Sequence, residues 1–192
     1  DILARHLDPL AGTAAQRERF GDRAVQACLQ QSVDFLLIAG DTFEAAAESL
    51  RARVALEKGF EKLAAHAVQA YVAAGAIDPA SAWKRWVHLP PNVTLLESDR
   101  SEPVLIRRDG TELAGIYIVA GPDTDESRWT GSGPAALGTH RPAPFQIGIV
   151  AAGAPVAWHE GRPVPPESPG ASQAAARLVQ AAREGGVDSL AL

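Results

Sequence analysis

Asp41, which follows an apolar run and a glycine, is the residue of this sequence best placed to do chemistry. The run 33–39 leads into Gly40-Asp41, the run 68–74 into the segment 75–78 that ends at Asp78, and the run 145–150 into 151–153. In an α/β sheet, ligands bind at the carboxyl ends of the strands, so a carboxylate there would point into the crevice. Carboxylate oxygens suit a hard or borderline metal ion. Asp41 could equally cap the helix that follows it, which is a common role for aspartate, and the spacing alone leaves both roles open.

The elements that must position these aspartates are two strands joined by a helix. The spacing of apolar residues predicts helices over 14–31 and 44–67. The runs 33–39 and 68–74 are predicted as strands, and the first is apolar enough to be buried on both faces, as in a parallel sheet. Strand, helix and strand, with glycine-containing turns, indicate a βαβ unit and an α/β fold.

The second half of the sequence predicts shorter elements and long loops. Asp109-Gly110 favours a tight hairpin turn between strands within 103–118. Glycine and proline mark 121–144 and 153–170 as long loops. The remaining elements expected are a short helix within 81–87, strands at 93–96, 145–150 and 187–192, and a helix over 171–183.

Composition narrows the classes of partner and compartment. The net charge is −5, so the composition as a whole gives no sign of a positively charged surface for nucleic acid. The scattered pairs of basic residues are expected on a solvated surface. No apolar run approaches the roughly 18 residues that a membrane span needs. Cys28 is the only cysteine, which excludes an internal disulfide and a zinc site with several cysteines. We expect Cys28 to be a small core residue and the protein to be cytoplasmic and not bound to a membrane.

Histidines and tryptophans give no second candidate site. Four histidines lack the spacing of metal ligands and are expected at the surface or as helix caps: His66, His88, His140 and His159. Tryptophans such as Trp83 and Trp86 suit either packing against the sheet or a recognition surface.

Three segments resemble the motifs of calcineurin-like metallophosphoesterases. Residues 33–44 resemble the Gly-Asp-x-x-Asp motif, 73–80 stand where the superfamily has Gly-Asn-His-Asp, and 6–10 resemble its first motif. Their order resembles the SbcD-like branch of bacterial DNA-repair exonucleases, in which Gly-x-Asp-x-x-Ala-Leu leads into Gly-His-x-His. Residues 186–192 match that lead-in.

This resemblance implies a fold and a domain organisation. The fold would be a two-sheet metallophosphoesterase-like sandwich flanked by helices, with 1–192 forming a single domain. Since 186–192 stops before the expected histidines, we expect the sequence to end within a core strand, with the C-terminal part of the family domain beyond it.

The resemblance also implies a two-metal centre, with two Mn²⁺ or similar ions about 3.5–4 Å apart that activate water for attack on phosphorus. Carried over residue by residue, the bridging aspartate falls on Asp41 and the second acid of that motif on Glu44. If His6 is aligned with the histidine of the first motif, Ala4 stands at the position of its aspartate. If Asp1 is aligned with the aspartate instead, Leu3 stands at the position of the histidine. Either register leaves that pair of ligands incomplete.

Most other ligand positions of the family carry side chains that cannot bind metal. In the third motif the asparagine becomes Ala76, the catalytic histidine becomes Ile77, and the supporting aspartate is Asp78. In the fourth motif, the ligand histidine at the end of the strand becomes Ala151. Methyl groups cannot coordinate a cation, and isoleucine cannot donate a proton. We therefore expect no two-metal cofactor in this chain, with at most His6 and Asp41 as remnant ligands.

Two functions follow from the resemblance and its departures. The first is a phosphodiesterase of the DNA-repair exonuclease type with weak hydrolysis or none, whose implied partners are DNA ends, an ATPase subunit and a second copy of the chain. The alternative is a non-catalytic binding or scaffold protein that keeps the fold.

Overall fold

A computed structural model describes residues 14–75, 77–96, 103–120, 143–150, 157–159, 162–164 and 189–191. The fold is mixed α/β, as predicted, with a three-stranded sheet, a four-stranded sheet and a small hairpin. The chain forms two compact units, one made of Asp1–Val72 and Ile77–Leu95, the other of Ala73–Ala76 and Leu96–Leu192. In chain order the elements are α1 (Ala14–Gln30), β1 (Phe35–Ala39), the 3₁₀ helix η1 (Ala45–Ala47), α2 (Leu50–Ala65), β2 (Gln69–Ala73), α3 (Ala80–Trp86), β3 (Val93–Leu96), β4 (Val104–Arg108), β5 (Thr111–Ala120), β6 (Phe145–Val150), β7 (Ala157–His159), β8 (Arg162–Val164) and β9 (Ser189–Ala191).

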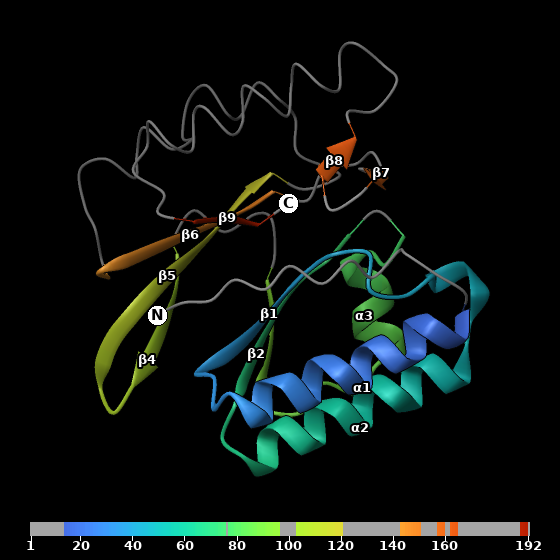
Figure 1. Ribbon diagram of the computed structural model, residues 1–192, viewed down its shortest axis with the longest axis horizontal. Helices are drawn as coiled ribbons and strands as arrows, with labels where there is room; N and C mark the ends of the chain where they lie inside the picture. Colours follow the sequence, from blue (N-terminus) through green and yellow to red (C-terminus); the bar gives the residue numbers. More distant parts are fainter. Residues whose placement is uncertain are drawn as a thin grey trace. The chain divides into compact units, whose positions relative to one another are not determined.

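Helices α1 and α2 lie side by side beside the first sheet, whose strand order is β1-β2-β3 (Figure 1). The two helices approach closely at Gly59, where an added Cβ would lie 3.2 Å from Cγ2 of Val25. Cys28, on the same helix as Val25, is buried, which confirms it as a core residue. Burial raises the pKa of its thiol, so the neutral form is favoured.

The helix predicted over 44–67 is divided in the structure, and this prediction was wrong at its start. After η1 the chain turns at Glu48, which has a positive φ of 46°, and α2 begins at Leu50. The break is stabilised locally, because the Ser49 hydroxyl accepts a hydrogen bond of 3.2 Å from Ala52 N–H. At the other end His66 caps the helix with its Nδ1 2.9 Å from the Lys62 carbonyl oxygen, so its expected role as a cap is confirmed.

The core of the first unit includes buried residues of α2 and β2. Phe60 and Leu63 of α2 are buried, and so are four of the five residues of β2. Asn92 is also buried, and its Nδ2 donates to the carbonyl oxygens of Phe60 (3.3 Å) and Val68 (3.1 Å). This amide therefore fastens the end of α2 and the start of β2 to the turn before β3.

Strand β1 differs from the expectation of burial on both faces. All five of its residues are half-buried. In the described sheet β1 stands at the end of the strand order, next to β2 alone, whereas β2 has a neighbour on each side. The apolar run correctly predicts the strand but does not reveal its position in the sheet.

In the second unit, β4 and β5 form the antiparallel hairpin predicted around Asp109-Gly110. Both turn residues have positive φ angles, 51° and 79°, as a type I′ turn requires. Strand β6 pairs in parallel with β5 and with β9, so the predicted strands at 145–150 and 187–192 are present.

The structure can be compared with the loop predicted over 153–170, but hardly with the loop predicted over 121–144 or the helix predicted over 171–183. Within 153–170 the structure has an antiparallel pair, β7 and β8. Most of 121–144 and all of 171–183 lie outside the described residues. None of the helices described is long and apolar enough to cross a membrane.

Candidate functional site

The candidate site lies where the loops after β1 and β2 meet. The backbone N–H of Ala45 donates to the carbonyl oxygen of Ile77 (3.0 Å), and Ile77 N–H donates to Oδ1 of Asp41 (3.2 Å). These contacts join the Gly-Asp segment after the first strand to the Ile-Asp segment after the second. The structure thus brings together Asp41 and Asp78, the two aspartates with which the sequence argument began.

Asp78 is the buried centre of this meeting point. Its side chain has no exposed surface. Oδ1 accepts a hydrogen bond from Asp41 N–H (2.9 Å), and Oδ2 accepts from Thr42 N–H (2.9 Å) and from the indole Nε1–H of Trp83 (3.1 Å). A buried carboxylate is costly unless it is well hydrogen-bonded, and these three donors supply that stabilisation. The Asp78 carboxylate therefore holds the loop after β1 by hydrogen bonds to its backbone.

Asp41 has a different environment from Asp78. It is half-buried, and its φ angle of 50° lies in the left-handed region, directly after Gly40 at 92°. Residues other than glycine adopt this region at a cost, and aspartate is among those that tolerate it best. With its backbone N–H bonded to Asp78 and its Oδ1 bonded to Ile77 N–H, Asp41 is held at both ends of the residue.

The other predicted positions give little coordinating chemistry. Glu44 is exposed, and its side chain does not cap η1, which follows it. Ile77 is 41% exposed and presents an apolar surface at the position where the resembled family has a catalytic histidine. The hydroxyl oxygen of Thr42 is buried and has no hydrogen-bond partner within the described part of the chain.

The described residues of this meeting point offer few metal ligands. Among the residues that the structure describes, no group of three or more histidine, cysteine, aspartate or glutamate side chains could hold a metal ion. Asp41 already has one carboxylate oxygen bonded to the backbone, and no histidine lies among the described residues of the loop. His6, expected as a remnant ligand, and Ala76 and Ala151, expected where ligands are lost, lie outside the described residues.

Trp83 is the contributor that the sequence argument did not assign to the site. It is fully buried in α3, so of the two roles considered for it, packing is the one observed. Its ring contacts Phe43 edge-on with ring centroids 5.0 Å apart and lies 6.4 Å from the ring of Phe60. The separation of five residues between Asp78 and Trp83, across the first turn of a short helix, is the sequence signal that could have revealed the contact.

Comparison with known proteins supports a metallophosphoesterase-like class. No family profile matches the chain. A segment of 93 residues is 33% identical to part of a metallophosphoesterase, which supports a metallophosphoesterase-like fold. That protein is the uncharacterized metallophosphoesterase YhaO of Bacillus subtilis (strain 168). The match covers 48% of this chain but only 23% of the length of YhaO.

Proposed function

We propose that this chain is a metallophosphoesterase-like domain, built as a two-sheet sandwich flanked by helices, in which phosphodiester hydrolysis is weak or absent. The similarity to a metallophosphoesterase supports the class. The observation that carries the loss of hydrolysis is the side chain of Ile77. It is apolar and 41% exposed, and it stands where the resemblance implies a proton donor.

For the substrate class, we propose the DNA-repair exonuclease type. Support comes from the resemblance of residues 186–192 to the lead-in of the SbcD-like branch and from the order of the earlier motifs. DNA ends and an ATPase subunit are the partners that this resemblance implies. The negative net charge of the chain favours a role for such a partner in attracting DNA, because the chain has no basic excess of its own.

A second candidate, a non-catalytic binding or scaffold domain, is favoured by the hydrogen bonding around Asp78. A site that has lost its metals needs another way to hold its loops, and the three donors to Asp78 provide it. In this role the domain would keep the fold and would require neither Mn²⁺ nor hydrolysis.

The direct test measures Mn²⁺-dependent hydrolysis of bis-(p-nitrophenyl) phosphate, together with Mn²⁺ binding by isothermal titration calorimetry. We expect no hydrolysis above the metal-free blank and no stoichiometric binding of two ions per chain. Hydrolysis that rises with Mn²⁺ and disappears with chelator would refute the proposed loss of activity. Binding of two ions without hydrolysis would contradict the scaffold candidate.

A variant that restores the missing side chains sharpens this test. Ala76→Asn, Ile77→His and Ala151→His together supply the ligands and the proton donor that the resemblance implies. We expect this triple variant to bind Mn²⁺ more tightly than the unchanged chain, with Ile77→Leu as a control that adds no ligand. Equal Mn²⁺ affinity in the triple variant and the control would show that more than these positions prevents metal binding.

A further inference from the structure

A shallow groove in the first unit lies apart from the residues of the candidate site. Its volume is about 290 Å³. The residues that line it come from the turn before α2, the first turns of α2 and the last turn of α3: Glu48, Leu50, Arg53, Arg85 and Trp86. We refer to these five residues as the α2–α3 groove. Neither Asp41 nor Asp78 lines it.

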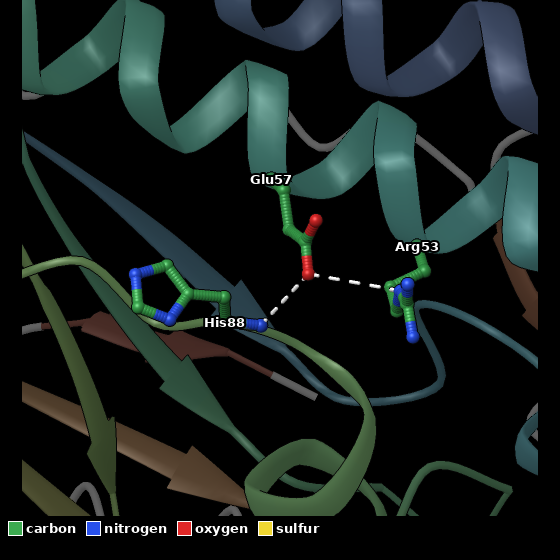
Figure 2. Close-up of polar contacts among 3 residues, drawn as sticks. All are labelled: Arg53, Glu57 and His88. Carbon is green, nitrogen blue, oxygen red and sulfur yellow. Dashed lines mark hydrogen bonds and ion pairs between the residues drawn. The ribbon is translucent and has the colours of Figure 1, made fainter.

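Arg53 lies beside an acidic residue of its own helix, Glu57. Its Nε lies 3.8 Å from Oε1 of Glu57, one helical turn further along α2. The same oxygen accepts a hydrogen bond of 2.9 Å from His88 N–H, so Glu57 bridges the two residues (Figure 2). The Nε atom is shielded from solvent, while 43% of the Arg53 side chain is exposed. The exposed part of this side chain is therefore open to an anionic partner.

The groove also contains a second arginine and apolar surface. The guanidinium of Arg85 lies 5.6 Å from the centre of the Trp86 ring, a cation–π arrangement. Leu50 is 62% exposed, although it is a large hydrophobic residue at the start of a helix. Arginine and tryptophan are enriched where proteins bind each other, especially at the residues that contribute most of the affinity.

We propose that the α2–α3 groove binds an acidic segment of a partner protein. A carboxylate of the segment would bind between Arg53 and Arg85, where the fork of a guanidinium can donate two hydrogen bonds. A neighbouring apolar side chain of the segment would cover Leu50 and Trp86. This site goes beyond the proposed function and does not depend on it, since it uses no residue of the candidate phosphoesterase site.

Charge favours a peptide over a nucleic acid as the occupant. The groove is lined by two arginines and one glutamate, Glu48. A polyphosphate backbone needs an extended row of cations, which two arginines do not supply. A single carboxylate beside an apolar side chain matches two arginines, one tryptophan and one exposed leucine.

The test begins with selection of short random peptides displayed on phage against the immobilised 192-residue chain. The selected peptides are then labelled with fluorescein and titrated with the unchanged chain and with variants, using fluorescence anisotropy. We expect enrichment of peptides with aspartate or glutamate beside leucine, phenylalanine or tryptophan. Arg85→Glu should weaken binding about tenfold or more, and Leu50→Gln about threefold or more.

Lys58→Glu is the matched control, because Lys58 is an exposed residue of α2 outside the groove and the change in charge is the same. It should change the affinity by less than about twofold. Thermal melting by circular dichroism checks that each variant folds, and both groove variants alter exposed side chains.

Several results would overturn this proposal. The selected peptides could lack any enrichment in aspartate or glutamate. The unchanged chain and Arg85→Glu could bind the selected peptides with equal affinity. Tighter binding of a labelled oligothymidylate that displaces the peptides would assign the groove to nucleic acid. A dimer in analytical ultracentrifugation that Leu50→Gln dissociates would assign it to a second copy of the chain.

Discussion

Asp41 and Asp78 follow neighbouring strands of one sheet, yet their carboxylates are used differently. Asp78 has no exposed surface and accepts hydrogen bonds from three N–H donors, one of them an indole. Asp41 is half-buried, has a left-handed backbone, and its Oδ1 accepts one bond from Ile77 N–H. The difference shows that a carboxylate near a strand end can serve the fold, and that Asp78 does so with more burial and more donors than Asp41.

The largest expected effect comes from removing the Asp78 carboxylate. Asp78→Ala leaves two backbone N–H groups and the Trp83 indole without their acceptor. We expect the free energy of unfolding to fall by about 3 kcal/mol or more, because each unsatisfied buried donor costs about 1–3 kcal/mol. Urea denaturation followed by circular dichroism measures this change. A loss below about 0.5 kcal/mol would show that Asp78 does not anchor the loop.

An intermediate effect is expected from removing one donor to Asp78. Trp83→Phe keeps an aromatic ring beside Phe43 but removes the indole N–H, and it should cost about 1–2 kcal/mol. The control is Trp86→Phe, which changes a half-buried tryptophan of the same helix and should cost less. The comparison uses the midpoints of chemical denaturation, and an equal cost for the two variants would argue against a special role for the indole.

The smallest effect is expected at Asp41. Asparagine tolerates a left-handed φ and retains a side-chain oxygen that can accept from Ile77 N–H, so Asp41→Asn should change stability by less than about 0.5 kcal/mol. Asp41→Ala loses that acceptor and should be less stable than Asp41→Asn. If Asp41→Asn proved as damaging as Asp78→Ala, the contrast between the two aspartates would be wrong.

Much of the fold could be predicted because it depends on local patterns. The apolar runs mark β1 and β2, and Asp109-Gly110 marks the hairpin turn. The break before α2 could not be read from periodicity, because apolar residues continue through it and the cap at Ser49 involves a single side chain. The half-burial of β1 depends on which strands flank it, which no local pattern records.

The candidate site was predictable in its residue types but not in its bonding. The resemblance to metallophosphoesterases predicts that Ile77 and Asp78 stand at the positions of a histidine and its supporting aspartate. It does not show that the Asp78 carboxylate faces the N–H groups of Asp41 and Thr42, because that contact requires the intervening helix to bring the two loops together. The indole donor of Trp83 was missed for a similar reason, since a tryptophan in a short helix suits several roles.

The bonds of Asp78 also have a consequence for the rates of folding and unfolding. They join residues that lie 37 and 36 positions apart in the chain. Contacts across such a distance form after the intervening chain has closed into a loop, and α2 must pack before they can be made. Interactions absent from the folding transition state act mainly on the unfolding rate. We therefore expect the buried carboxylate to prolong the lifetime of the native state more than it hastens its formation.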